Sequence, residues 1–486
     1  MLSTTDRIKE LFATFCTDSI SAIDKLPQAG SERSYYRIHT ASKNYISTYG
    51  ANIKENESFL YFSEHFGKKK LATPKIFAVN KEKDIYIQED FGDVSLLNRL
   101  EAEGFSLPVY ELYKKSLHQL ALLQVKGHEG MDYKKCLTNS SFGKEAIMAD
   151  LLYFKYYFLD ALRRPYDKQK LIKDFEALSN YLSHTEYKFF MFRDFQSRNI
   201  MIKQDGGVGF IDYQGGMKGA PQYDVASLLS QAKANLTEEW KQNLLEDYIN
   251  SFEAIVEETV DRDVFRSQYN GYVLIRLLQV LGAYGFRGLF ERKAHFLTSI
   301  PLALNNLKSF ITHHSIGIAV PEFKKVLEIC ISDEVIAEFT PIQATAETPL
   351  TVAINSFSFL QQGYPKDETS NGGGFVFDMR GILNPGRFDD CKYLSGLDKP
   401  VKDFLEQQTK MPDFLNSVYS IVDISVEDYI KRGFENLSIN FGCTGGQHRS
   451  VYAAEAVARH LRNKFKVKIV LNHSNQQNWK KEPPRP

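Results

Sequence analysis

The 486-residue chain is poor in cysteine, has no net charge and contains no long apolar run. Its 5 cysteines are an odd number, are scattered and form no CxxC pair, which argues against a disulfide framework or a zinc site. The 60 basic residues balance 60 acidic ones, which argues against a surface devoted to nucleic acid or membrane. The N-terminal MLSTTDRIKELFATF carries charge where a secretory signal needs an apolar core. We therefore expect a cytoplasmic protein with no membrane partner.

Chain length and proline placement predict two folded parts joined by a linker. A chain of 486 residues is longer than a single core usually serves. Residues 339–349 are small and polar and are interrupted twice by proline, which indicates a boundary. We assign 1–315 to a first domain, 316–348 to a terminal helix and linker, and 349–486 to a second domain.

The first domain begins with a helix and strand-like runs and continues with long helical stretches. Its expected strands lie at 35–38, 44–48, 84–88, 189–192, 200–202 and 208–211, and its expected helices lie within 109–182 and 223–335. A small sheet-rich lobe (about 25–95) before a large helical lobe (about 96–315) predicts a kinase-like, bilobal α+β fold.

The second domain alternates strands with helices. Buried strands are expected at 350–359, 375–379, 437–441 and 467–471, with helices at 401–408, 411–422 and 451–464. This βαβ rhythm predicts a small α/β domain with a parallel or mixed sheet.

Residues 192–214, FRDFQSRNIMIKQDGGVGFIDYQ, carry three oxygen-bearing side chains around an expected hairpin. Asp194 and Asn199 stand in D-x4-N spacing, the Asp-Gly turn at 205–206 indicates the hairpin, and Asp212 follows it. Phosphoryl transfer requires a carboxylate that accepts the proton of the attacking hydroxyl, and oxygen ligands for Mg²⁺. We assign Asp194 the first role, and Asn199 and Asp212 the second. Each alone would pass as a turn or cap residue, but together they favour a phosphoryl-transfer site.

This segment resembles the aminoglycoside phosphotransferase-like kinases, in particular the branch that phosphorylates N-acetylmuramate and N-acetylglucosamine at the anomeric hydroxyl. The resemblance spans about residues 5–315 and includes GSERSYYR (30–37), QEDFGD (88–93) and PQYDVASLL (221–229). It implies ATP and Mg²⁺ as cofactors and an amino sugar as substrate, with Asp224 supporting the catalytic loop. The implied nucleotide-binding residues are Gly30, Ser31, Glu32, Arg33, Ser34 and Glu89.

The expected strand at 44–49 lacks a residue that the wider kinase fold places there. A lysine on this strand usually reaches the nucleotide phosphates, whereas here the strand reads NYISTY, and Lys43 and Lys54 lie outside it. The loss of one such electrostatic contact costs about 3 kcal/mol of transition-state stabilisation. A weak or inactive kinase is therefore an open alternative.

Residues 441–457, FGCTGGQHRSVYAAEAV, predict a strand, a glycine-bearing loop and the start of a helix. Free backbone N–H groups at a helix start attract an anion, and the helix dipole and Arg449 strengthen that attraction. Gly445 and Gly446 allow the loop amides to turn inward. The segment is therefore expected to bind a phosphate or sulfate group.

The same loop has the bare pattern of a tyrosine phosphatase. Cys443 and Arg449 stand in C-x5-R order, and a thiolate at a helix start can attack phosphorus. The reaction would also need an acid, for which Asp378 or Asp389 is a candidate. A C-x5-R phosphatase is a minor alternative.

A longer match competes with the phosphatase hypothesis. Residues 349–474 resemble the C-terminal domain of the bacterial RNase adapter (RapZ) family through GCTGGQHRSVY (442–452), FDMR (377–380) and SGLDKPV (395–401). The resemblance implies a domain that binds glucosamine-6-phosphate and a small regulatory RNA and that self-associates. The anion-binding candidates are Thr444, Gly445, Gly446, His448 and Arg449, with Arg380 as a further contact.

This second match is partial. The N-terminal half of the adapter family is a Walker-type nucleotide domain, and no GxxxxGK[ST] occurs here. RNA binding in that family also depends on a basic C-terminal end. The corresponding residues here are Arg459, Arg462, Lys464, Lys466, Lys468, Lys480, Lys481 and Arg485, with Trp479 nearby for stacking. A solvated helix face with a loose tail explains this pattern equally well.

Both domains point to amino-sugar metabolism. Our leading hypothesis is an ATP- and Mg²⁺-dependent sugar kinase of cell-wall recycling fused to a module that senses a phosphorylated sugar. The rival is a non-catalytic adapter in which a degenerate kinase lobe serves as a binding scaffold and the C-terminal domain presents RNA to a nuclease.

Overall fold

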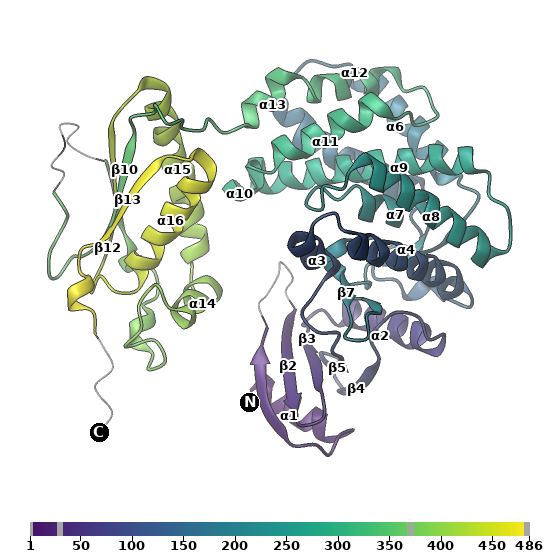
Figure 1. Cartoon of the computed structure of the whole chain (residues 1–486), viewed down its shortest axis with the longest axis horizontal. Helices are drawn as coiled ribbons and strands as arrows, with labels where there is room; N and C mark the ends of the chain where they lie inside the picture. The colour runs from purple at the N-terminus through teal and green to yellow at the C-terminus, as the bar shows by residue number, and fades with distance from the viewer. Residues whose placement is uncertain (1–2, 27–32, 367–368, 370–373, 481–486) are drawn as a thin grey trace. The chain divides into compact units, whose positions relative to one another are not determined.

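The chain forms two units, each described by itself (Figure 1). The structure, a computed structural model, describes residues 3–26, 33–366, 369 and 374–480. Unit 1 comprises Met1–Tyr156, Arg163–Gly282 and Asn305–Ile329, and unit 2 comprises Tyr157–Leu162, Ala283–Leu304 and Cys330–Pro486. The segment expected to hold a terminal helix and linker contains two helices, α12 (Pro321–Cys330) and α13 (Asp333–Phe339).

A five-stranded antiparallel sheet opens unit 1. Its strands, in spatial order, are β1 (Ile20–Lys25), β2 (Ser34–Thr40), β3 (Asn44–Tyr49), β5 (Ile85–Glu89) and β4 (Ile76–Val79). The expected strands at 35–38, 44–48 and 84–88 are confirmed, whereas β1 and β4 were not predicted. Both unpredicted strands lie at the edges of the sheet, where partial exposure weakens the alternating pattern.

Two helices cover the two faces of this sheet. Helix α1 (Thr4–Ala13) is capped by Ser3 and packs Ile8 and Phe12 in one core with Ile87. Helix α2 (Ile53–Lys68) is on the opposite face, where Phe59 stacks on Tyr86 at 5.2 Å between ring centres. Because side chains alternate along a strand, neighbouring residues of β5 contact different helices.

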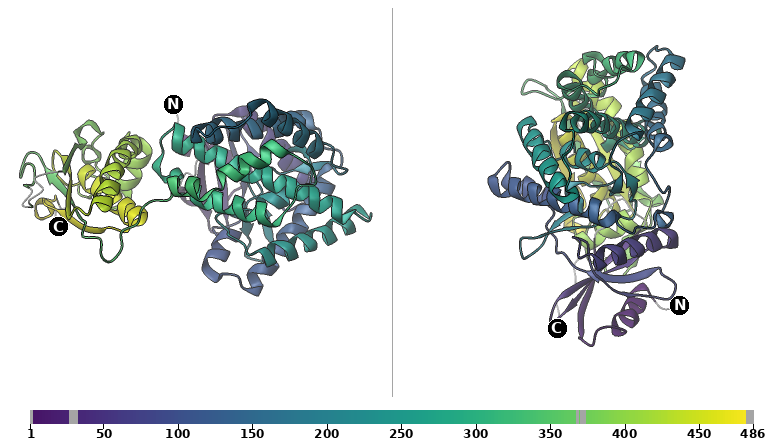
Figure 2. Two further views of the ribbon diagram at one scale, coloured as in Figure 1. Left: turned by 90° about the horizontal axis from the view of Figure 1, so that it is seen from above. Right: turned by 90° about the vertical axis from the view of Figure 1, so that its right-hand side faces the viewer.

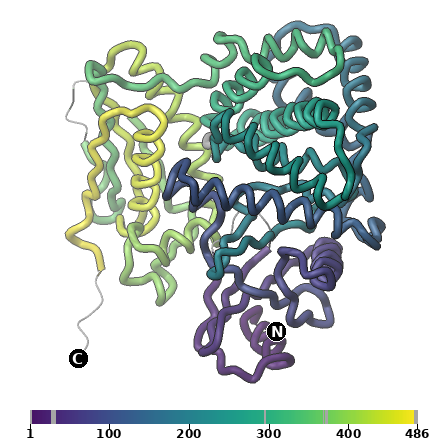
Figure 3. The backbone as a smooth tube through the Cα atoms, turned by 45° about the vertical axis from the view of Figure 1, so that its right-hand side comes forward, coloured from purple at the N-terminus to yellow at the C-terminus, as the bar shows by residue number. Residues whose placement is uncertain are grey.

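The larger lobe of unit 1 is helical, and Figure 3 shows it in blue to green beside the purple sheet. Helices α4 and α8 contact each other within it. Two short antiparallel ladders, β6 with β9 and the hairpin of β7 with β8, flank the segment 192–199. The elements are α3 (Leu96–Glu103), α4 (Leu107–His128), α5 (Lys144–Phe154), α6 (Lys168–Ser183), β6 (Phe189–Met191), β7 (Ile200–Ile202), β8 (Val208–Phe210), β9 (Met217–Gly219), α7 (Gln222–Leu229), α8 (Glu238–Val256), α9 (Arg262–Tyr284) and α11 (Ile300–His313).

One helical stretch among the described residues, Arg262–Phe290, is long and apolar enough by composition to cross a membrane. It comprises α9 and the turn that follows. Within the protein, 56% of its most apolar window is buried. A core helix of a folded domain passes the same test of length and composition.

Unit 2 is built on a four-stranded sheet in which every neighbouring pair is parallel. The spatial order is β11 (Gly374–Asp378), β12 (Asn436–Cys443), β10 (Thr351–Ser358) and β13 (Lys468–His473). Helices α14 (Lys399–Gln408), α15 (Met411–Arg432) and α16 (Arg449–Phe465) follow the expected alternation, and Figure 2 shows this unit from two further directions. The predicted α/β domain is confirmed, and its sheet is parallel rather than mixed.

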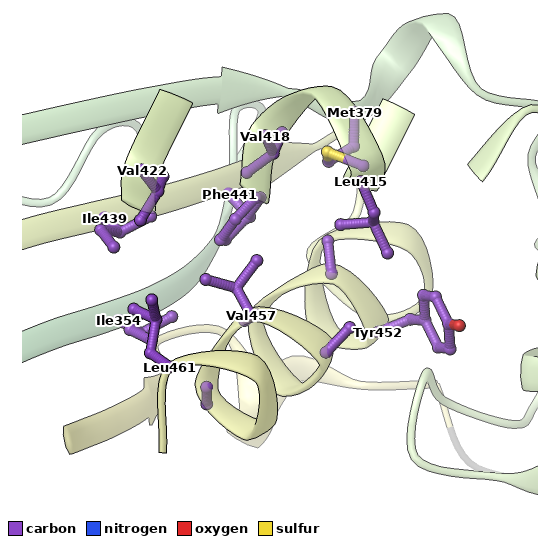
Figure 4. Packing of buried hydrophobic residues seen from close by; sticks show 14 of the residues in the cluster. Ile354, Met379, Leu415, Val418, Val422, Ile439, Phe441, Tyr452, Val457 and Leu461 are labelled. Carbon is purple, nitrogen blue, oxygen red and sulfur yellow. The ribbon is translucent and has the colours of Figure 1, made fainter. Parts of the chain in front are cut away.

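Apolar side chains from the sheet meet α15 and α16 in a single core (Figure 4). Ile354 and Phe441 project from the strands, Val422 from α15, and Val457 and Leu461 from α16, and all five are fully buried. This core fixes the end of β12 against the start of α16. The loop between them, residues 444–448, is therefore held at both ends.

Candidate functional site

The loop between β6 and β7 brings together the segments that carry the three predicted phosphoryl-transfer residues. The Asn199 amide nitrogen donates to the carbonyl of Asp194 at 2.9 Å, and the Asn199 carbonyl accepts from the Ile211 amide at 3.0 Å. The β7–β8 hairpin pairs Ile200 with Phe210, so Asp212 follows directly beside Asn199. Asp194 is exposed and Asn199 is buried. The Asp194 carboxylate is therefore accessible to a substrate, while the Asn199 side chain is held in place.

Asp212 stands in an unusual backbone conformation. Its φ is +71°, which is uncommon for a residue other than glycine and is held only where the surroundings impose it. The next residue, Tyr213, is fully buried, lies 2.6 Å from Ser63 through its hydroxyl and stacks on Phe59 at 4.8 Å. One Asp212 oxygen accepts from the Gln214 amide at 2.7 Å. This anchoring sets the direction of the Asp212 carboxylate.

Asp224 supports the loop at 192–199 through buried hydrogen bonds. One of its oxygens accepts from the Phe192 amide at 2.8 Å and from Gln124 at 3.0 Å, and the other accepts from the Arg193 amide at 2.8 Å. Complete burial raises the pKa of Asp224 to about 7, against the lowering effect of these hydrogen bonds. The two amides immediately before Asp194 are thus fixed by one buried side chain.

A second charged cluster borders the same loop and was not predicted. The Arg193 guanidinium lies 3.8 Å from the Asp150 carboxylate of α5. Arg276, buried in α9, donates to the Tyr223 hydroxyl at 3.1 Å. Burial lowers the pKa of Arg276, but Tyr223, Asp194 and Asp150 raise it overall. An arginine within the apolar run VLIRLL was the signal that could have revealed this cluster.

The residues predicted to bind the nucleotide lie in separate segments, and three of them are outside the described residues. Gly30, Ser31 and Glu32 lie outside the described residues. Ser34 begins β2, and Arg33 precedes it with 4% of its surface exposed. Glu89 ends β5, is exposed, and accepts from the Lys75 amide at 3.2 Å.

The donor set suits Mg²⁺ bound together with phosphates. Asn199 uses its amide nitrogen within the loop and so has its oxygen for a ligand, and Asp212 supplies a carboxylate. These are hard oxygen donors of the kind that Mg²⁺ prefers. Within the described ranges, no three His, Cys, Asp or Glu side chains gather as a metal site. Two protein donors would therefore hold the ion only with phosphate oxygens as further ligands.

The loop after β12 exposes its first two residues, which precede α16 by several positions. Thr444 and Gly445 are exposed, while Gly446 is buried with a φ of +62°. A side chain at position 446 would come within 2.9 Å of Asn475, so glycine is needed there. Asn475 and Trp479 donate to the carbonyls of Gly445 and Gly446, each at 2.8 Å. The loop is thus rigid and leaves its first two residues open.

The charged anion-binding candidates in this loop are directed into the protein. Arg449 is 4% exposed and donates to the carbonyls of Arg380 at 3.2 Å and Ile382 at 2.7 Å. His448 contacts the Cys391 carbonyl at 3.0 Å, and burial lowers its pKa. Arg380 differs from these two residues, because it lies outside the loop and is exposed, and its guanidinium pairs with Asp378 at 2.6 Å. Spacing predicted these residues but not their direction.

Cys443 is buried among polar neighbours. It is 2% exposed, its sulfur accepts from the Gly446 amide at 3.2 Å, and it lies 3.1 Å from the Ser450 hydroxyl. A nucleophilic thiolate needs access to its phosphate ester. This geometry gives the C-x5-R phosphatase hypothesis no support.

Comparison with known proteins finds relatives of both parts. A nucleotide-binding protein of Endomicrobium trichonymphae is 35% identical over 140 residues, which cover 29% of this chain and 46% of that protein. One from Fervidobacterium nodosum is 30% identical over 199 residues, covering 38% of this chain and 66% of that protein. The chain thus spans about half to two thirds of the length of these curated relatives.

Solved structures similar to this chain include small-molecule kinases. A choline/ethanolamine kinase family protein from Mesorhizobium loti is 12% identical with a TM-score of 0.44, covering 68% of this chain and 99% of that one. Choline kinase from Streptococcus pneumoniae is 13% identical with a TM-score of 0.40, covering 64% of this chain and 100% of that one.

Two family models match separate parts of the chain. The phosphotransferase enzyme family matches residues 26–261, which hold Asp194, Asn199 and Asp212. The RapZ C-terminal domain matches residues 350–477, which hold the loop at 444–448. The chain therefore joins a domain of the phosphotransferase enzyme family to a RapZ C-terminal domain.

Proposed function

We propose that this protein uses ATP and Mg²⁺ to phosphorylate a hydroxyl of an amino sugar of the N-acetylmuramate or N-acetylglucosamine type. One observation supports this most directly: Asn199 is hydrogen-bonded to Asp194 and to Ile211, the residue before Asp212, so the backbone segments that carry the predicted base and metal ligands lie side by side. The match of residues 26–261 to the phosphotransferase enzyme family supports phosphoryl transfer as the class of reaction.

Each of the four polar residues at this site has a distinct task in the proposed reaction. Exposed Asp194 accepts the proton of the attacking sugar hydroxyl. Asn199 and Asp212 would hold Mg²⁺, which would neutralise the negative charge of the phosphates. Asp224 positions Asp194 by fixing the two preceding amides. The protein thus contributes mainly orientation and electrostatics.

The arginines beside Asp194 favour an acceptor that carries a negative charge. Arg193 is the more exposed of the two, with 27% of its side chain accessible, and its partner Asp150 is 3.8 Å away, which is a loose contact for an ion pair. Arg276 adds a buried positive charge close enough to Asp194 for mutual electrostatic influence. N-acetylmuramate has a lactyl carboxylate that N-acetylglucosamine lacks. We therefore favour N-acetylmuramate.

A kinase assay over a panel of amino sugars tests this function. Wild-type protein with ATP, Mg²⁺ and N-acetylmuramate should release sugar phosphate, and Asp194→Ala should lose this activity by about 1000-fold. Asp205→Ala is a matched control, because Asp205 is an exposed carboxylate in the adjacent hairpin turn. Wild type that is inert towards every amino sugar would refute the proposal.

We further propose that the RapZ C-terminal domain senses a phosphorylated amino sugar. The exposed Thr444 and Gly445 in the loop that precedes α16 support this, because successive backbone amides in a turn form an anion-binding concavity. Coupling between sensor and kinase would act in both directions. Glucosamine-6-phosphate should raise the melting temperature of the wild type and of Asp205→Ala equally. An unchanged melting temperature would refute this role.

The adapter hypothesis is tested separately by RNA binding. Exposed Arg459, Arg462, Lys466 and Lys468 favour it, whereas Lys464 is paired with Asp423 at 2.7 Å. Affinity for a small structured RNA should fall steeply with salt, because phosphate contacts release counterions. No binding at low salt would remove this function.

A further inference from the structure

Strand β3 has no lysine on the face of the N-terminal sheet that packs against α2. Thr48 is paired with Tyr35 of β2 and with Tyr86 of β5. Tyr86 stacks on Phe59 of α2, so this row of side chains, including Thr48 and its alternating neighbour Ile46, faces α2. In kinases a strand lysine occupies this face and pairs with a helix glutamate.

Arg33 reaches the same face from the start of β2. It stands two residues before Tyr35, so both side chains lie on one side of the strand. One Arg33 guanidinium nitrogen is 3.2 Å from the Glu55 carboxylate of α2, and the guanidinium carbon is 5.7 Å from the centre of the Phe59 ring. The side chain is 4% exposed. Arg33 and Glu55 thus form the ion pair that a strand lysine and a helix glutamate form in kinases.

Stacked rings connect Arg33 to the predicted Mg²⁺ ligand. Phe59, which lies beneath Arg33, stacks on Tyr213 at 4.8 Å between ring centres, and Tyr213 directly follows Asp212. The Tyr35 phenol is influenced by both charges: burial raises its pKa, Arg33 lowers it and Asp212 raises it. The guanidinium therefore lies on the side of the sheet that faces Asp212.

The two lysines nearest β3 in sequence are placed elsewhere. Lys43 lies 4.9 Å from the ring centres of Tyr45 and Phe77, which belong to the core beneath α1. Lys54 is exposed near the start of α2. Arg37, also on β2, is paired with Asp90 at 2.7 Å.

We propose that Arg33 supplies the positive charge that the missing strand lysine would bring to the nucleotide phosphates, with Glu55 as its positioning partner. This inference rests on the proposed phosphotransferase function. Arginine stays charged when buried, and its planar fork offers several donors to phosphate oxygens. Glu55 compensates the buried charge and holds the guanidinium beneath the sheet.

Binding of the nucleotide without any acceptor tests this inference. Affinities of the full chain for Mg·ATP and for adenosine are measured by calorimetry. Arg33→Gln should weaken Mg·ATP binding by about 30-fold, because charge-assisted hydrogen bonds to phosphate are lost. Its affinity for adenosine should stay within about twofold, because adenosine has no phosphate. Arg33→Lys, which keeps the charge, should recover most of the loss.

Arg7→Gln is the matched control. Arg7 lies on α1 and is paired with Asp84 at 2.7 Å, so it resembles Arg33 in pairing but not in position. Both affinities should be unchanged in this variant. If Arg33→Gln does not fold, the double variant Arg33→Met with Glu55→Gln removes both charges and should show the same selective loss.

Two outcomes would overturn the inference: an Arg33→Gln variant that binds Mg·ATP as wild type does, or one that loses ATP and adenosine equally. Selective loss of Mg·ATP binding in a protein that phosphorylates no amino sugar would support the role of Arg33 and refute the proposed acceptor reaction. The two proposals therefore fail in different ways.

Discussion

The loops at 192–199 and 444–448 were both predicted from residue spacing to handle phosphate, and they differ in where their charged groups point. In the first loop Asp194 is exposed and its supporting side chains are buried beneath it. In the second loop the supports are Arg449, which is buried, and His448, which is partly buried, and the exposed residues are Thr444 and Gly445. A charged residue in a binding motif can therefore either contact a ligand or shape the loop that does.

The largest effect is expected when the buried support of the first loop is removed. Asp224→Ala leaves the Phe192 and Arg193 amides without their buried acceptor, so kcat should fall by about 1000-fold. Steady-state kinetics with the best amino-sugar acceptor would measure this. Asp205→Ala provides the baseline, and a kcat within threefold of wild type in Asp224→Ala would show that the clamp is dispensable.

The same carboxyl group predicts a dependence of stability on pH. Burial raises the folded-state pKa of Asp224 to about 7, so the folded protein binds the proton of this carboxyl more tightly than the unfolded chain does. The resulting stabilisation against unfolding is complete below the unfolded pKa near 4 and is lost as pH rises through about 7. The change amounts to about 4 kcal/mol over this range. Urea unfolding of wild type and Asp224→Asn between pH 4 and 8 isolates it, and parallel curves for the two proteins would contradict it.

Removing the support of the second loop should destabilise its own unit. Arg449→Ala deprives the Arg380 and Ile382 carbonyls of a charged donor, which should cost about 2–3 kcal/mol. Arg462→Ala, an exposed position on the same helix, should cost less than about 0.5 kcal/mol. Chemical unfolding measures both, and the stabilisation by glucosamine-6-phosphate should be lost in Arg449→Ala. A melting shift equal to wild type would show that the loop keeps its shape without this side chain.

A smaller effect concerns acceptor choice at the first loop. Arg193→Gln should lower the ratio of kcat/KM for N-acetylmuramate over N-acetylglucosamine by about 10-fold, because this variant cannot make the charged contact that we propose to the lactyl group. Arg198→Gln changes an exposed arginine of the same loop and serves as the control. An equal loss on both sugars would assign Arg193 to loop structure instead.

The smallest effect is expected at Cys443. Cys443→Ser should change stability by less than about 1 kcal/mol and should leave kinase activity and sugar-phosphate stabilisation unchanged, because a serine hydroxyl can also accept from the Gly446 amide and hydrogen-bond to Ser450. A phosphate monoester hydrolysis that disappears in this variant would instead revive the phosphatase hypothesis.

Local patterns predicted the elements whose residues determine their own conformation. The Asp-Gly turn predicted the β7–β8 hairpin, and apolar runs predicted β10 and β12. Edge strands β1 and β4 escaped prediction because their side chains are only partly buried. The Arg276 cluster was also not predicted, because its members come from α5, α7, α9 and the loop at 192–199 and no spacing rule connects them.

By itself the sequence determined the two-part architecture and the identity of the residues on both loops, because turns, strand alternation and D-x4-N spacing are local properties. Only the tertiary structure decided which charges face a ligand. The direction of Arg449 depends on carbonyls nearly 70 residues away, and the pairing of Arg33 depends on the helix that follows β3. A long, charged side chain points towards the buried group that pairs with its charge, and only folding brings that group within reach.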